Sequence, residues 1–216
     1  MDLRVSFVVD GLNLYHSLQE IEKISKARVR WLDLRKLCAS YLHVVRNAVG
    51  ERVELENVDY FSAIASHLAS RDPGAVSRQS AYLAVLDDSG VNVTLSRFKQ
   101  KDVICPRCGN RFIRHEEKET DVAIGMKLME IAARGEREVA VVISGDTDMV
   151  PAIKAAKRLS PSLVVGVAFP FMRHNTELQA VADFTFSISQ RDVQRAQFPS
   201  TVSLSDGRTI VKPANW

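Results

Sequence analysis

Short apolar runs alternate with amphipathic stretches along the chain. The clearest case is residues 139–143 (VAVVI), an unbroken apolar run rich in β-branched residues. Such a run is typical of a strand buried on both faces of a parallel sheet. It stops at Ser144-Gly145-Asp146-Thr147-Asp148, and apolar residues then recur at spacings of three and four as far as Leu159. This recurrence predicts a helix, so a buried strand passes into a helix through a turn that carries two aspartates.

The same alternation predicts the rest of the fold. Residues 4–9 form a first strand, which ends at Asp10-Gly11-Leu12-Asn13 and is followed by a helix to about residue 23. The further expected elements are a helix from residue 31 to Gly50, strands at 58–61 and 91–98 with a helix between them, a helix at 120–133, strands at 163–169 and 183–188, and a short helix at 177–181. Repeated strand and helix predict an α/β fold with a parallel, doubly wound sheet flanked by helices.

The domain organisation follows from where this pattern stops. We expect one domain over residues 1–190, interrupted by an irregular, cysteine-containing insertion at 99–118. Residues 191–216 read as a tail or a hairpin, with Asp206-Gly207 as its turn.

Charge is almost balanced overall but uneven along the chain. The net charge is +3 from 29 Lys and Arg against 26 Asp and Glu, whereas residues 97–118 hold seven Lys or Arg against three acids. A basic patch beside an acidic cleft suits a nucleic-acid enzyme, because phosphates are steered by cations. The alternative for this segment is a solvated loop.

The chain shows no signal peptide at its start and no apolar stretch long enough to cross a bilayer. Its three cysteines do not make a disulfide framework. We therefore expect a cytoplasmic protein with no membrane partner.

Acidic residues follow the predicted strands. Asp10, Asp146 and Asp148 come after two of them, and Asp121 opens the helix at 120–133. Any one of these could be a helix N-cap, but the pair at 146 and 148 offers two carboxylates where capping needs one. Open α/β sheets bind ligands at the carboxyl ends of their strands.

The chemistry available to such a cluster is that of a hard cation. Carboxylate, Asn and Ser oxygens suit Mg²⁺ or Mn²⁺, and a metal-activated water can hydrolyse a phosphodiester without a protein nucleophile. The chain has no G-x-S-x-G elbow, Walker loop or G-x-G-x-x-G, so serine-hydrolase, nucleoside-triphosphate and dinucleotide functions lose support.

Four segments also resemble the NYN domain family, a branch of the PIN-like ribonuclease superfamily, in order and spacing. They are FVVDGLNLYHSL, EKETDVAIGMKLME, VAVVISGDTDMVPAIKAAKR and NTELQAVADFTF, within residues 4–188. The resemblance implies a Rossmann-like PIN fold and a magnesium-dependent nuclease that mostly acts on RNA. The family's acidic positions match Asp10, Asp121, Asp146 and Asp148, and its polar positions match Asn13 and Ser144.

One departure from the family concerns the turn before Asp121. Where the family often has Lys-Gly-Val-Asp, this chain has Lys118-Glu119-Thr120-Asp121. The path of the turn is therefore open, and Glu119 is either an extra ligand or a solvated side chain.

The chemistry and the resemblance together give each residue a hypothetical role. Asp10 and Asp146 are expected to bind the metal directly, and Asp121 and Asp148 to bind it or to orient its waters. Asn13 and Ser144 would hold waters or a substrate phosphate. Lys118 and Arg173 either contact substrate phosphate or have only surface roles. Tyr15 and Trp31 either stack a base or belong to the core.

A second candidate metal site lies in the insertion. Cys105-Pro106-Arg107-Cys108-Gly109 has the form of a zinc-ribbon knuckle, with His115 as a third ligand. The fourth would come from Glu116, Glu117 or a second chain, and a four-cysteine zinc shared by two copies would make a homodimer. Free thiols and disulfide chemistry stay open as alternatives, and Cys38 is expected in the core.

The favoured hypothesis is therefore a metal-dependent ribonuclease that hydrolyses single-stranded or structured RNA. One alternative is a non-catalytic RNA-binding adaptor of the same fold, acting through residues 99–118. The other is a metal-dependent phosphatase on small phosphate esters.

Overall fold

A seven-stranded sheet forms the centre of the computed structural model, which describes residues 2–69, 71–135 and 138–216, without the side chains of residues 114–117. The strand order is β4-β3-β2-β1-β5-β6-β7. The strands are β1 (Leu3–Asp10), β2 (Val53–Ala63), β3 (Asn92–Ile104), β4 (Arg111–Lys118), β5 (Glu138–Ile143), β6 (Val164–Phe169) and β7 (Phe184–Ser187). All neighbouring pairs are parallel except β3 and β4. The prediction of a doubly wound, mainly parallel sheet is confirmed.

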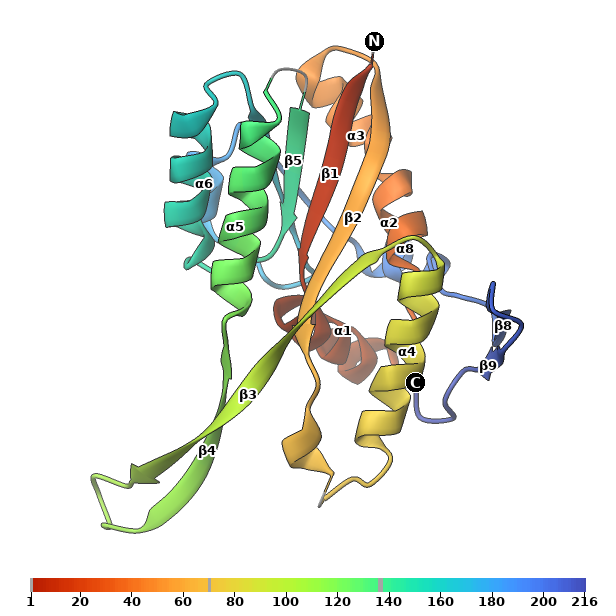
Figure 1. Ribbon diagram of the computed structural model, residues 1–216, viewed down its shortest axis with the longest axis vertical. Coiled ribbons are helices and arrows are strands. Elements are labelled where there is room, and N and C mark those ends of the chain that lie inside the picture. The colour runs from red at the N-terminus through yellow and green to blue at the C-terminus, as the bar shows by residue number, and fades with distance from the viewer. Residues whose placement is uncertain (1, 70, 136–137) are drawn as a thin grey trace.

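The sheet reverses its winding between β1 and β5. Strands β1, β2 and β3 step outward in one direction, and β5, β6 and β7 step outward in the other. In an open α/β sheet the loops at such a switch point part, and they leave a crevice at the carboxyl ends of the strands. In Figure 1 this edge lies at the bottom of the sheet, where β1 leads into α1 (Gly11–Ser25).

Two apolar cores cover the two faces of the sheet. Phe7 and Val9 face one core and Val8 the other, because side chains alternate along a strand. The first core is built with α1, α2 (Leu34–Ser40), α3 (Leu42–Val49), α4 (Ala75–Asp88) and α8 (Gln190–Arg195). The second is built with α5 (Thr120–Ala133), α6 (Met149–Leu159) and α7 (Thr176–Val181). No helix in the described ranges is both long and apolar enough to span a membrane.

The prediction of a single helix between residue 31 and Gly50 is wrong, because this segment forms two helices that meet at Tyr41. Tyr41 has φ −97° and ψ 0° and stands between α2 and α3. Its hydroxyl donates to Asp192 at 2.7 Å and accepts from the backbone N–H of Ser189 at 3.1 Å. These contacts hold the tyrosine to the loop before α8, about 150 residues further along the chain.

The prediction that residues 99–118 are irregular is also wrong, because this segment is a regular antiparallel hairpin. Strand β3 continues to Ile104 and β4 returns beside it, with Lys99 opposite Glu116 and Ile104 opposite Arg111. We call residues 97–118 the arm. It projects from the body of the molecule at the lower left of Figure 1. No described side chain between residues 99 and 113 is buried. Because neither face of the hairpin is buried, the sequence of this segment lacks the alternation of apolar and polar residues that predicts a strand.

The C-terminal segment contains the expected hairpin. Strands β8 (Thr201–Ser203) and β9 (Thr209–Val211) pair antiparallel, and Gly207 adopts φ +86° in the turn between them. Val193 of α8 and Leu204 belong to the first core, so the segment packs on the body. The domain boundary at residue 190 stays a prediction.

The arm should be dispensable for folding. Replacing residues 100–115 by Asn-Gly joins Lys99 to Glu116, which already face each other, through the two-residue turn that antiparallel strands prefer. Because no described side chain of the removed segment is buried, we expect the melting temperature to stay within about 3 °C of the wild type, as for a change of roughly 1 kcal/mol or less. Calorimetry checks this, and a fall of 10 °C or more would show that the arm stabilises the core.

Candidate active site

The candidate site begins where β1 and β5 end side by side. Val9 is paired with Ile143, so the next residues, Asp10 and Ser144, emerge together at the switch point. Asp10 is buried, with 6% of its surface exposed, and Ser144 is completely buried. The Ser144 hydroxyl donates to Asp10 Oδ2 at 2.9 Å, while Asp10 Oδ1 accepts the backbone N–H of Asn13 at 3.0 Å and so caps α1. Asp10 is therefore a helix cap and a site carboxylate at the same time.

Further hydrogen bonds connect the two strand-to-helix turns and fix the backbone of the second turn. Asn13 Oδ1 accepts the backbone N–H of Gly145 at 3.0 Å, and the Ser144 hydroxyl accepts the backbone N–H of Asp146 at 3.0 Å. A Cβ atom at Gly145 would collide with the carbonyl oxygen of Arg173, so only glycine lets the loop after β6 close over this turn. The side chains of Asn13 and Ser144 thus shape the site by fixing its backbone.

The third carboxylate comes from another segment. Asp121 lies in the first turn of α5, directly after the arm, and its side chain is exposed. Partial burial raises its pKa above the ordinary value, and the charges of Asp10, Asp146 and Asp148 raise it further. The structure therefore brings all four predicted aspartates within electrostatic reach of one another.

Asp10 is perturbed in the same direction. Burial raises its pKa, and the charge of Asp146 adds to that effect, while its hydrogen bonds with Asn13 and Ser144 act against it. Carboxyl groups with perturbed pKa values are a recognised sign of a functional site. Capping alone does not explain the cluster, since Asp148 makes no side-chain cap bond to α6 and the cap position of α5 is Glu119.

The turn before Asp121 resolves the open question about Glu119. This residue adopts φ +79°, a conformation that glycine takes far more easily, which accounts for a glycine at the corresponding family position. Its carboxylate pairs with Arg97 across the root of the arm, with Nη2–Oε1 at 2.6 Å and Nε–Oε1 at 3.0 Å. The Glu119 carboxylate therefore links β3 to the start of α5 through an exposed ion pair, a role that neither sequence alternative named.

Two basic residues border the cluster. Lys118 is exposed as the last residue of β4, opposite Arg97. Arg173 lies in the loop after β6 with its backbone against Gly145, and its Nε is buried with no hydrogen-bond partner in the described part of the chain. A buried, unpaired donor of this kind is costly unless a ligand satisfies it.

Whether the aspartates fit a metal depends on how closely they converge. Among the described side chains, no group of three or more His, Cys, Asp or Glu residues is arranged so that it could hold a metal ion. The types of donor nevertheless fit Mg²⁺ or Mn²⁺, because Mg²⁺ binds through one or two carboxylates and keeps several waters, which other carboxylates hold. Burial is the main cause of the raised pKa values of Asp10 and Asp121, and a divalent cation would offset the repulsion that adds to it.

The cysteines divide as the sequence suggested. Cys38 is completely buried in the first core, and none of the three cysteines forms a disulfide. Cys105 and Cys108 lie at the tip of the arm, where Gly109 adopts φ +69° and donates its N–H to the Cys105 carbonyl at 2.9 Å. Hydrogen bonds from the Cys108 and Arg107 backbones lower the pKa of the Cys105 thiol, with a smaller contribution from the Cys108 side chain. The His115 side chain lies outside the described residues, so zinc and a shared homodimer site stay predictions.

Sequence reasoning did not find the supports of the site. The ion pair of Arg97 with Glu119 and the steric role of Gly145 depend on partners 22 and 28 residues away. Tyr15 is half-buried, as a stacking residue would be, whereas Trp31 is completely buried and belongs to the core.

Comparison with known proteins assigns the class. The profile of the NYN domain matches residues 4–190, so the chain belongs to the NYN domain family, which has a PIN-like nuclease fold. The chain is also 23% identical to 6-hydroxy-3-succinoylpyridine 3-monooxygenase HspA of Pseudomonas putida, over 99% of this chain and 75% of that protein. A solved protein of unknown function from Vibrio parahaemolyticus superposes with a TM-score of 0.54 at 20% identity, over 87% of this chain and 94% of that one, which supports the fold.

Removing one of the repelling charges should stabilise the protein, with a defined pH dependence. The raised pKa of Asp121 means that its charged form disfavours the folded state, fully above the folded pKa and not at all below the unfolded value of about 4. Asp121→Asn should therefore raise the free energy of unfolding at pH 7, by less than about 1 kcal/mol because solvent screens the exposed carboxylate. Below about pH 4 the gain should vanish.

Urea unfolding at pH 7 and at pH 3.5, in the presence of EDTA, measures this difference. Asp102→Asn on the arm is the matched control and should show no gain that depends on pH in this way. If Asp121→Asn raised the free energy of unfolding equally at both pH values, this would contradict the claim that the charge of Asp121 destabilises the folded state.

Proposed function

We propose that this protein is a metal-dependent ribonuclease that hydrolyses phosphodiester bonds at the aspartate cluster. The observation that carries the proposal is the convergence of Asp10, Asp121, Asp146 and Asp148 from three separate segments at the switch point of a nuclease-type fold. When bound there, Mg²⁺ or Mn²⁺ would supply an activated water and charge neutralisation at the phosphate.

The chain's own residues have distinct roles in this proposal. Asp10 and Asp146 hold the cation directly, and Asp121 and Asp148 bind it or orient its waters. Ser144 and Asn13 keep Asp10 and the turn before Asp146 in place through the hydrogen bonds described above. Arg173, whose backbone lies against Gly145, would contact a substrate phosphate through its guanidinium.

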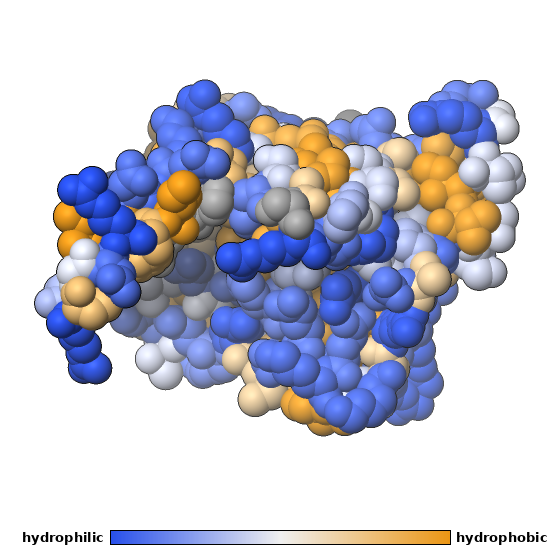
Figure 2. Space-filling model, turned by 90° about the horizontal axis from the view of Figure 1, so that it is seen from below, coloured by the Kyte–Doolittle hydropathy of each residue, from blue (hydrophilic) through white to orange (hydrophobic). Residues whose placement is uncertain are grey.

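The arm supplies a path for the rest of the RNA. It carries exposed Lys99, Lys101, Arg107 and Arg111, and it leads through Lys118 directly to Asp121. Figure 2 views this edge from below and shows a mostly hydrophilic surface, with the arm standing out from the body at the left. Cations along the arm would hold the phosphate backbone without reading its sequence.

An RNA-binding adaptor is the alternative that the same surface supports, because the arm would bind RNA whether or not the aspartates cut it. The monooxygenase activity in the name of the Pseudomonas relative belongs to that protein. It is not part of this proposal, since 23% identity indicates a shared fold rather than a shared reaction.

Cleavage of an end-labelled single-stranded RNA tests the proposal. Wild type should cut with Mn²⁺ or Mg²⁺ and not with EDTA, and Asp146→Asn should lower the rate roughly a hundredfold or more because it removes a metal ligand. Asp87→Asn, on the exposed surface of α4 and outside both the arm and the cluster, should cut like the wild type. Nucleoside monophosphates and 4-nitrophenyl phosphate, assayed in parallel, should not be hydrolysed, which separates a nuclease from a phosphatase.

Retained metal-dependent cleavage by Asp146→Asn would contradict the assignment of the site. RNA binding without cleavage by any of the proteins would favour the adaptor. In that case the arm-shortened protein should lose affinity and show a weaker dependence of binding on salt.

A further inference from the structure

A cavity of about 170 Å³ lies on the face of the sheet that α1 and α4 cover, whereas α5, which carries Asp121 in its first turn, covers the other face. Its walls come from α1, the end of β2, α4, the root of β3 and the C-terminal residue Trp216. Most of the lining is aromatic or aliphatic, and the rings are Tyr15, Tyr60, Tyr82, Phe98 and Trp216.

The cavity stays open because its neighbours are small and fixed. Ala63, Ala65 and Ala75 line it where larger side chains would fill it. Gln79 joins α4 to the end of β2, since its Nε2 donates to the Ala63 carbonyl at 2.8 Å and its Oε1 accepts the Ala65 N–H at 3.0 Å. The space is therefore preformed, which lowers the cost of binding.

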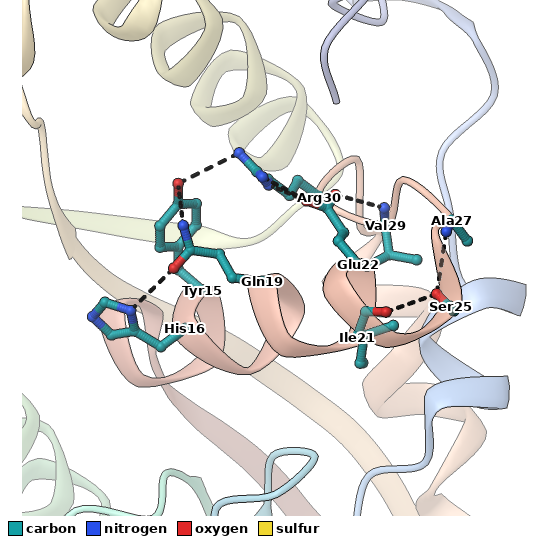
Figure 3. A network of polar contacts seen from close by, with 9 residues as sticks. All are labelled: Tyr15, His16, Gln19, Ile21, Glu22, Ser25, Ala27, Val29 and Arg30. Atoms are coloured by element: carbon teal, nitrogen blue, oxygen red, sulfur yellow. Dashed lines mark hydrogen bonds and ion pairs between the residues drawn. The ribbon is translucent and has the colours of Figure 1, made fainter. Parts of the chain in front are cut away.

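Polar contacts fix the wall formed by Tyr15. Arg30 lies over the Tyr15 ring at 5.5 Å from its centroid and donates to Glu22 Oε2 from Nε at 2.8 Å. Figure 3 shows this chain of contacts along α1, from His16 and Gln19 through Tyr15 to Arg30 and Glu22. The other arginine of the lining, Arg78, is paired with Asp72. Both cations are thus neutralised by acids, so the cavity suits an uncharged group rather than a phosphate.

The size of the cavity defines that group more closely. An apolar protein cavity of about 150 Å³ binds benzene. At about 170 Å³ this cavity accommodates a small aromatic ring system, and its volume lies below the range of about 300 Å³ or more that is typical of ligand sites. Aromatic walls favour a flat π-system.

The cavity is also coupled to the aspartate cluster through the chain. Gly11 and Leu12 line it, and they directly follow Asp10. A Cβ atom at Gly11 would lie 2.6 Å from the Tyr60 ring, so glycine allows that ring to reach the start of α1. A group in the cavity is thus separated from the buried carboxylate by the first turn of one helix.

We propose that the cavity binds the pyrimidine base of an RNA nucleotide whose phosphate lies at the aspartate cluster. The proposal rests on the proposed function for the identity of the ligand. It assigns the enzyme a preference for an unpaired pyrimidine next to the bond that is cut, because a paired base must first break its pairing and stacking to enter the cavity. A purine carries a second ring and is the larger base, so we expect it to fit less well.

Tryptophan fluorescence reports binding independently of cleavage. Trp216 lines the cavity, and the only other tryptophan, Trp31, is buried 6.4 Å from it between ring centroids. With Mg²⁺ present, cytidine 5′-monophosphate, which has no phosphodiester bond to cut, should change the emission saturably, and adenosine 5′-monophosphate should bind at least about tenfold more weakly. Free cytosine should bind more weakly than the nucleotide, and equal or tighter binding of the free base would overturn the assignment to RNA.

Filling the cavity supplies the matched pair of variants. Ala75→Phe, at the first position of α4, should abolish the fluorescence change, whereas Ala133→Phe, at the exposed end of α5, should leave it intact. Ala65→Phe serves as a second filling variant, and the melting temperature of each variant shows that it is folded. No saturable change in wild type, or an unchanged response in both folded filling variants, would overturn the proposal.

Cleavage of RNAs that differ at one unpaired position separates this inference from the proposed function. Wild type should cut beside a cytidine or uridine at least tenfold faster than beside an adenosine or an abasic residue, and Ala75→Phe should remove the preference. Metal-dependent cleavage without any preference would overturn the cavity assignment alone. Nucleotide binding without any cleavage would overturn the nuclease and leave the cavity as a base-binding site.

Discussion

The hydrogen bond from Ser144 to Asp10 joins the two halves of the sheet at the point where their winding reverses. The pairing of β1 with β5 and the Gly145 N–H donated to Asn13 also hold the two turns together. The site is therefore a polar frame that keeps carboxylates close to one another. Burial in this frame raises the pKa values of Asp10 and Asp121, and the neighbouring negative charges add to that effect. Such a frame suits a group that is itself positive and that binds a second anion, which is the property of a hydrated divalent cation at a phosphate.

Two different surfaces next to this frame would contact different parts of a substrate. The arm offers cations that contact a phosphate backbone over its length, and the ion pair of Arg97 with Glu119 fixes its root beside Asp121. The cavity is mainly aromatic, its cations are paired with acids, and Phe98 at the root of the arm is part of its lining. Backbone charge would thus be met along the arm and base shape in the cavity, which is how affinity and selectivity are commonly separated in nucleic-acid binding.

Much of the fold and the acidic site could be predicted from the sequence, because both rest on local signals. The apolar run at residues 139–143 predicts a strand buried on both faces. Because parallel strands bring their carboxyl ends to one edge of the sheet, the convergence of Asp10 and Asp146 follows from the topology. The arm was missed because neither of its faces is buried. The break at Tyr41 and the pairing of Glu119 depend on Asp192 and Arg97, which are distant in the chain. The cavity needs residues from Gly11 to Trp216, and no local pattern indicates it.

The central claim is that the four aspartates form one site for a divalent cation. The most direct test is the melting temperature of the wild type and of Asp146→Asn as a function of Mn²⁺ concentration. A ligand at a hundred times its dissociation constant stabilises the folded state by about 2.7 kcal/mol, which corresponds to a rise of about 5–10 °C for a chain of this size. The account predicts that rise in the wild type and its near-complete loss in Asp146→Asn. An unchanged melting temperature in the wild type, or an equal rise in both proteins, would contradict it.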